Sequence, residues 1–131
     1  MKQSFLKQAL QLFLAAVLLS LSTGGCTASE KTDYPEYSAA ENTSLGCIEL
    51  NCSGVVFRPY GVINTSDLRG KQIGVRKGVP ESKICEVKGF NPGEWIIEYL
   101  DMPMGGGDML FKAADAKEIP AELEQYKTYD Y

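Results

Sequence analysis

The chain has 131 residues, with 13 basic residues, 17 acidic residues and no histidine, so its formal net charge is −4. Because histidine is the commonest general base and metal ligand at neutral pH, its absence excludes serine triads, cysteine-histidine pairs and histidine-bound zinc. The acidic balance opposes nucleic-acid binding, which depends on basic residues that displace counterions from phosphates. We therefore expect no nucleic-acid partner, no metal, no cofactor and no enzymatic activity.

The first 25 residues have the features of an export signal. Lys2 and Lys7 give a cationic start, residues 10–21 are almost wholly apolar, and small residues lead up to Cys26. The apolar run is shorter than the roughly 20 residues that a permanent membrane helix needs. We expect residues 1–25 to be removed as a signal peptide.

The residues before Cys26 resemble the signal of bacterial lipoproteins, in which small residues precede a cysteine that receives a diacylglyceryl group. Gly24-Gly25-Cys26 matches that pattern, although Thr23 stands where the family usually has leucine. The resemblance implies that Cys26 is lipidated and anchors the protein on the extracytoplasmic side of the cell membrane. The alternative is ordinary signal-peptidase cleavage after Ala28, which would release a free protein.

Loss of the signal removes two lysines and no acidic residue, which leaves 11 basic and 17 acidic residues and a net charge of −6. Anionic lipid surfaces repel a chain of that charge. We therefore expect the lipid on Cys26 to be the membrane contact.

Residues 26–44 carry the lipidated cysteine and a polar segment that we expect to be a flexible linker. From residue 45 the pattern changes to short β-rich runs separated by Gly, Pro, Asn and Asp, which predicts a single β-domain over residues 45–126. A tail, residues 127–131, follows it. The runs predicted to be strands are residues 46–50, 55–60, 72–76, 83–88, 94–100 and 109–112. Six strands at this spacing predict an all-β fold, a small antiparallel meander that forms a barrel or a sandwich.

The run over residues 94–100 has the clearest alternation and predicts a central strand. Trp95 and Ile97 lie on one face, which we expect to point inward, and Glu94 and Glu98 lie on the other, which we expect to be solvated. Paired carboxylates could still perform acid-base hydrolysis without histidine. The acids that lie close together in the sequence are Glu94, Glu98, Asp101 and Asp108.

Two prolines and the glycine-rich segment mark local structure. Pro59 predicts that its strand lies at an edge or bends, and Pro120 predicts the start of a helical turn. Gly105-Gly106-Gly107 lacks the lysine and hydroxyl residue of a phosphate loop, so we expect a flexible connection between strands. The exposed segment 102–108 is the best candidate for an inhibitory loop.

Cysteines and tyrosines leave alternatives open. Cys47, Cys52 and Cys85 permit one disulfide and one free thiol. A hairpin around residues 51–54 would place Cys52 near its tip, so a bridge would use Cys85; three unbridged apolar side chains are the alternative. Three tyrosines near the C-terminus could form an aromatic handle for a sugar or peptide, or belong to a frayed end. They are Tyr126, Tyr129 and Tyr131.

Residues 68–74, LRGKQIG, and residues 84–97, ICEVKGFNPGEWII, resemble small uncharacterised exported domains of Gram-positive bacteria and the outer portions of antibiotic-sensing membrane metallopeptidases. The resemblance implies an extracytoplasmic β-domain with a binding or sensing role. No peptidase activity carries over, because the histidine-based zinc motif has no counterpart. We expect a membrane-anchored lipoprotein that binds or senses an unidentified protein or small molecule. Its alternatives are an inhibitor of an exogenous envelope-attacking enzyme and a carboxylate-based hydrolase.

Overall fold

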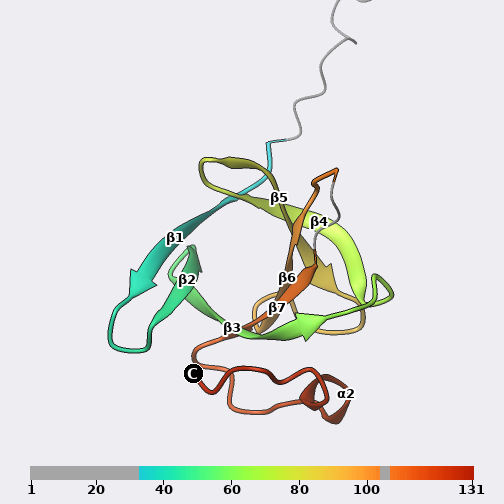
Figure 1. Ribbon diagram of the computed structural model, residues 1–131. Coiled ribbons are helices and arrows are strands. Elements are labelled where there is room, and N and C mark those ends of the chain that lie inside the picture. Colours follow the sequence, from blue (N-terminus) through green and yellow to red (C-terminus); the bar gives the residue numbers. More distant parts are fainter. Residues whose placement is uncertain (1–32, 104–106) are drawn as a thin grey trace, which may run out of the picture. The chain divides into compact units, whose positions relative to one another are not determined.

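The computed structural model describes residues 33–103 and 107–131. The predicted signal peptide and Cys26 lie outside these residues. The elements are β1 (Glu36–Asn42), β2 (Cys47–Cys52), β3 (Val55–Ile63), β4 (Arg69–Arg76), β5 (Val79–Val87), β6 (Trp95–Leu100), β7 (Asp108–Ala113) and the short helix α2 (Ala121–Glu124) (Figure 1).

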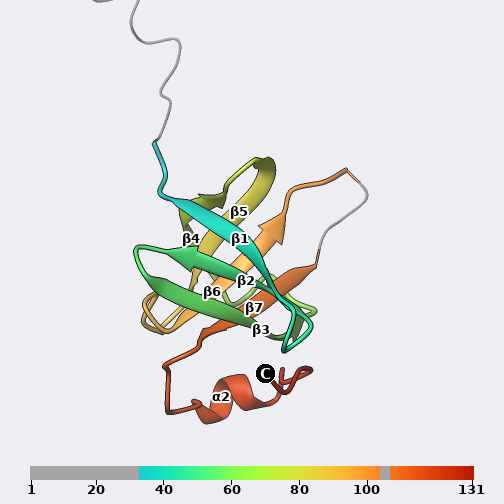
Figure 2. The same cartoon turned by 90° about the vertical axis from the view of Figure 1, so that its left-hand side faces the viewer.

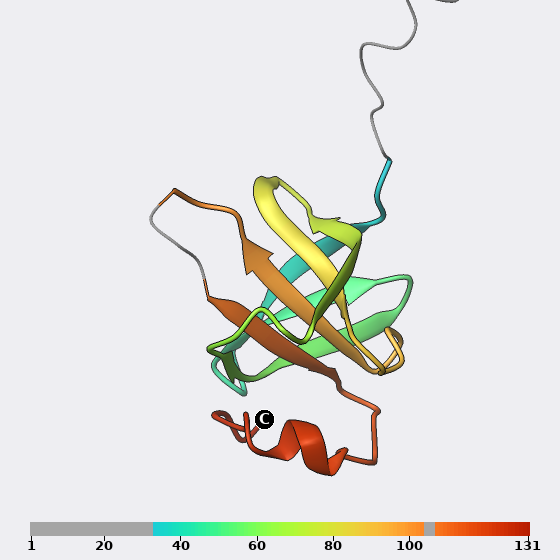
Figure 3. The same ribbon diagram turned by 90° about the vertical axis from the view of Figure 1, so that its right-hand side faces the viewer.

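The strands form a closed barrel in the order β1-β2-β3-β7-β6-β5-β4, which confirms the all-β prediction. Two antiparallel meanders build it, β1 to β3 (Figure 2) and β4 to β7 (Figure 3). One seam is the antiparallel pairing of β3 with β7. The other is parallel and short, with Glu36 opposite Val75 and Tyr37 opposite Arg76. Beyond these two pairs β1 and β4 separate.

One apolar cluster fills part of the barrel interior. It draws on six of the seven strands, and cross-strand partners in it share a face, as Ile96 of β6 and Phe111 of β7 do. Gly74 of β4 makes room for it, because a Cβ atom there would lie 2.3 Å from the ring of Tyr37. The buried members are Tyr37, Leu50, Phe57, Ile84, Ile96, Phe111 and Ala113.

A second cluster lies on the outer face of β3, β5, β6 and β7. The C-terminal segment with α2 crosses this side of the barrel (Figure 3) and adds Leu123, which is fully buried. Trp95 packs edge-on against Tyr60 with ring centroids 5.0 Å apart. The buried members are Tyr60, Ile63, Cys85, Val87, Trp95, Ile97, Leu110 and Leu123. The burial predicted for Trp95 and Ile97 is confirmed, but their predicted inward direction is wrong, since both lie on the outer face of the barrel beneath the C-terminal segment.

A β-bulge between Pro59 and Gly61 interrupts the pairing of β3 with β7. It changes the alternation, so that Pro59 and Val62 point into the barrel while Tyr60 and Ile63 point to the outer cluster. The bend predicted at Pro59 is confirmed. The helical turn predicted at Pro120 is confirmed too, since this residue caps the N-terminus of α2.

Two predictions are wrong. The flexible linker was expected to run to residue 44, but β1 occupies Glu36–Asn42 and pairs with β2 over five residue pairs. Glu98 was expected on a solvated face with Glu94, but only Glu94 is exposed; Glu98 retains 8% of its exposure. Its neighbours on the same face, Ile96 and Leu100, point into the barrel, and the carboxylate follows them.

Candidate functional site

The apolar cluster leaves the other part of the barrel interior open as a pocket of about 430 Å³. Barrels of about eight strands have interiors just wide enough for side chains or for one small ligand. The opening follows from the pairing, because β2 meets β3 at only three positions and β1 meets β4 at only two. The tip of the β1–β2 hairpin therefore diverges from β3, and the barrel is not packed there.

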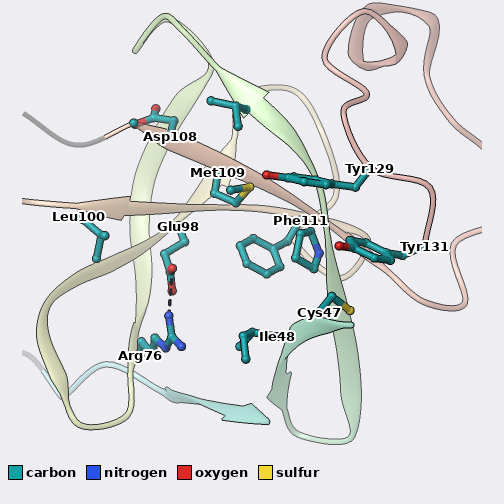
Figure 4. A pocket seen from close by; sticks show the side chains of 13 residues that line it. Cys47, Ile48, Arg76, Glu98, Leu100, Asp108, Met109, Phe111, Tyr129 and Tyr131 are labelled. Carbon is teal, nitrogen blue, oxygen red and sulfur yellow. Dashed lines mark hydrogen bonds and ion pairs between the residues drawn. The ribbon is translucent and has the colours of Figure 1, made fainter. Parts of the chain in front are cut away.

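The pocket is mainly apolar. Five strands and the C-terminal residues supply its wall, with Phe111 shared between the wall and the interior cluster. Figure 4 shows the side chains of Met109, Leu100 and Ile48 around the space. The lining residues are Cys47, Ile48, Pro59, Val62, Arg76, Glu98, Leu100, Gly107, Asp108, Met109, Phe111, Tyr129 and Tyr131.

A polar group lies on one side of this apolar wall. Arg76 donates to Oε1 of Glu98 at 3.4 Å (Figure 4). The Ser82 hydroxyl lies 3.2 Å from Oε2 of the same carboxylate. Ser82 is fully buried, whereas 27% of the Arg76 side chain is exposed. A buried carboxylate requires such partners, because an uncompensated charge in an apolar interior is costly.

The second buried acid, Asp108, faces away from Glu98. In the register of β6 and β7, Glu98 lies opposite Met109 and Tyr99 lies opposite Asp108, so the two carboxylates project to opposite faces of the wall. Figure 4 shows them pointing apart. Asp108 is held by Arg69, whose Nη2 and Nε atoms donate at 2.7 and 3.1 Å. These bonds raise the pKa of Arg69, and its guanidinium lies 3.6 Å from the ring centroid of Tyr99.

The C-terminal residues form another part of the pocket wall. Thr128 and Tyr129 donate their backbone N–H groups to the Tyr60 carbonyl at 2.9 and 3.1 Å, and Lys127 bridges to Gly61. Tyr129 and Tyr131 stack on each other with ring centroids 5.6 Å apart and both line the pocket. Tyr129 and Tyr131 therefore lie together at the pocket wall, and the frayed alternative does not hold for residues 127–129.

Close approach of the C-terminal segment depends on glycine. A Cβ atom at Gly61 would lie 1.6 Å from the carbonyl oxygen of Tyr126. No heavier residue fits there without moving one backbone segment. Tyr126 itself packs against the outer cluster and does not line the pocket.

The hairpin side of the pocket is fastened to β3 by an ion pair. Arg58 donates to Oε2 of Glu49 at 2.7 Å, and the Asn42 amide donates to the same oxygen at 3.2 Å. These two donors, Arg58 first, lower the pKa of Glu49. The contact holds the β1–β2 hairpin against β3 at the place where backbone pairing has ended.

Cys47, Cys52 and Cys85 are free thiols, so the unbridged alternative is the one observed. Burial, followed by the charge of Glu49, raises the pKa of the Cys47 thiol at the pocket wall. Burial also raises the pKa of Cys85. Both shifts disfavour the nucleophilic thiolate.

The remaining predicted site residues do not converge. Glu94 is exposed, and Asp101 is exposed and pairs with Lys83 at 3.1 Å. Residues 104–106 of the candidate inhibitory loop lie outside the described residues. Within residues 33–103 and 107–131, no group of three acidic, cysteine or histidine side chains is placed to hold a metal ion. None of the helices in that part of the chain has the length and apolarity needed to cross a membrane.

Comparison of the chain with protein-family models, with curated proteins and with solved structures found no match. The site is therefore interpreted from its own geometry. Sequence reasoning missed Arg76 and Glu98 as a pair, because they lie 22 residues apart and meet only when β4 and β6 take their places on either side of β5 in the barrel.

Proposed function

We propose that the protein is a membrane-anchored extracytoplasmic lipoprotein whose barrel binds or senses a small molecule and performs no catalysis. The pocket carries the proposal. Its volume of about 430 Å³ lies within the roughly 300 to 1,000 Å³ typical of small-molecule sites, and an apolar wall with a few polar groups is the usual composition of such sites.

An unfilled barrel interior also has an energetic cost that a ligand would offset. Protein interiors are normally close-packed, and each missing contact forfeits dispersion energy. The side chains of Phe111 and Met109 line the pocket but do not fill it. Ile48 and Val62, at the edge of the pocket, therefore remain substantially exposed. A ligand that covered these side chains would be stabilised by their burial.

The two alternative functions have less support. A carboxylate-based hydrolase needs two acids that converge on one substrate bond, whereas Glu98 and Asp108 project to opposite faces and each is bonded to an arginine. The alternative of an inhibitor takes residues 102–108 as its candidate loop, and nothing in the pocket geometry requires such a loop.

The proposed address rests on the sequence. The small residues before Cys26 and the apolar run before them support lipidation there. A diacylglyceryl group supplies two chains, and stable anchoring takes two such signals. The expected topology places the barrel outside the cell membrane, where it meets envelope or environmental compounds.

The test is recovery of bound compounds from a small-molecule extract of the native envelope. Full-length protein in lipid nanodiscs is incubated with the extract, washed and analysed by mass spectrometry, with empty nanodiscs as the blank. We expect compounds that bind the wild type and fail to bind Val62→Trp, which fills the pocket edge. Ile119→Trp changes an equally exposed apolar residue that does not line the pocket, so it should bind like the wild type. Equal recovery by both variants would count against the pocket as the binding site.

A further inference from the structure

The chemical class of the ligand can be inferred from the hydrogen-bonding capacity that remains at the pocket wall. Arg76 carries five N–H donors in a planar fork. Among the described residues its side chain makes one hydrogen bond, the 3.4 Å contact with Glu98, and that contact is long for a charge-assisted pair. Most of its donors are therefore free at the edge of the pocket.

Glu98 does not have comparable capacity. Its Oε1 accepts from Arg76 and its Oε2 lies 3.2 Å from the fully buried Ser82 hydroxyl, so both oxygens already have partners. Its side chain is also less accessible, with 9% exposed against 27% for Arg76. The arginine is thus the group that can bind a ligand, and Glu98 and Ser82 position it.

The other ionisable groups that line the pocket do not offer a ligand a second charge. Asp108 is a lining residue, but its carboxylate is paired with Arg69 on the opposite face of the wall. The Cys47 thiol stays protonated at neutral pH, because the ordinary pKa of a thiol already lies above 7 and burial raises the pKa of Cys47 further. The exposed ion pair of Lys83 with Asp101 lies outside the lining residues.

We propose that the pocket binds a monocarboxylate with an apolar or aromatic body, its carboxylate on the guanidinium of Arg76. This inference rests on the proposed binding function and specifies its ligand. The carboxylate accepts from the arginine fork, and the body lies against Met109, Phe111 and Leu100. The stacked rings of Tyr129 and Tyr131 cover it on the side of the C-terminal segment.

A single negative charge fits better than a phosphate dianion. Arg76 already lies beside the carboxylate of Glu98, so it supplies too little positive charge to balance the two negative charges of a phosphate dianion. The planar fork of its guanidinium also matches the geometry of a carboxylate. The net negative charge of the chain repels an anion only over short range, since salt screens exposed charges beyond roughly 8 to 10 Å.

The test compares three probes of one shape, 3-phenylpropionate, 3-phenylpropionamide and 3-phenylpropylamine, by calorimetry. The full-length protein is held in lipid nanodiscs, and heats from empty nanodiscs are subtracted. In the wild type we expect the carboxylate to bind about 10-fold to 100-fold more tightly than the amide, as a charge-assisted bond predicts. The amine should bind weakest of the three.

Variants assign the preference to one residue. Arg76→Gln should abolish the preference for the carboxylate, and Arg76→Lys should retain part of it, because it keeps the charge and loses the fork. Lys71→Gln removes the same charge from an exposed side chain outside the pocket and should leave all three affinities unchanged. Selectivity in the wild type needs no variant, so a folding defect in Arg76→Gln does not affect that result.

Two outcomes separate the inference from the function on which it rests. Tightest binding by the amine, or equal binding by the carboxylate and the amide, would overturn the carboxylate assignment while small-molecule binding stands. If none of the probes binds while envelope compounds do, the carboxylate assignment again fails alone. If neither probes nor envelope compounds bind, both proposals fall.

Discussion

Replacement of Gly61 by alanine tests whether the C-terminal segment is a true wall of the pocket. The new Cβ would lie 1.6 Å from the carbonyl oxygen of Tyr126, whereas ordinary contacts begin at 3.4 Å, so one backbone must move by nearly 2 Å. The hydrogen bonds from Thr128 and Tyr129 to the Tyr60 carbonyl measure 2.9 and 3.1 Å and cannot survive such a shift. Two lost bonds at about 0.5 to 1.5 kcal/mol each give about 1 to 3 kcal/mol.

The assay is amide hydrogen exchange together with thermal unfolding. We expect Gly61→Ala to lose protection at Thr128 and Tyr129 and to lower the unfolding free energy by this amount, with envelope compounds bound more weakly. If Leu123 also leaves the outer cluster, its burial adds about 1.5 to 3 kcal/mol to the loss. Gly93→Ala is the control, because its nearest atom is the flexible Asn91 side chain at 3.3 Å. Unchanged protection at Thr128 and Tyr129 in Gly61→Ala would refute the reasoning.

Three further predictions concern the core, the pH response and the anchor. Trp95→Ala should cost about 3 to 5 kcal/mol in unfolding free energy, because it leaves a cavity in the outer cluster, while exposed Glu94→Ala should stay within about 0.5 kcal/mol; equal melting of both would contradict the assignment. Burial, with a smaller contribution from the Cys52 charge, raises the pKa of Tyr37 to about 12 from 10.0, so the unfolded chain loses this proton first and stability falls as pH rises from 10 to 12. Denaturant titrations should show that this alkaline loss is smaller by about 3 kcal/mol in Tyr37→Phe, and equal losses would show that Tyr37 is not responsible. Cys26→Ser should either leave the precursor uncleaved in membranes or release a chain cut after Ala28; fractionation and intact mass distinguish these, and a fully processed variant that still sediments with membranes would contradict lipid anchoring at Cys26.

The strands that pack side chains on both faces were predictable from their sequence. In β6, Trp95 and Ile97 lie on one face and Ile96 and Leu100 lie on the other. This period-two pattern was enough to predict the strand from the sequence. The strand β1 was missed because its side chains carry no such signal: of its seven residues, only Tyr37 is buried. Backbone pairing with β2 holds this polar strand in the barrel, and side-chain periodicity cannot report pairing of that kind.

The pocket could not be predicted because its parts come from distant segments. Arg76, Glu98 and Tyr129 meet only when the two meanders close and the C-terminal segment crosses β3. One local signal was available for Glu98. Glu98 lies on a strand face between Ile96 and Leu100. A single acid between two apolar residues on one face is as consistent with a buried carboxylate that has a partner as with a solvated one, and Glu98 is buried and bonded to Arg76.

Methyl NMR spectroscopy of the full-length protein in nanodiscs, before and after addition of the envelope extract, tests the central claim most directly. The claim is that the open part of the barrel interior is a ligand site. It predicts shifts for the methyl groups of Ile48, Val62 and Leu100, which line the pocket, and none for Val87 and Leu123, which lie in the outer cluster. Shifts confined to Val87 and Leu123, or an unchanged spectrum at the pocket methyl groups, would contradict it.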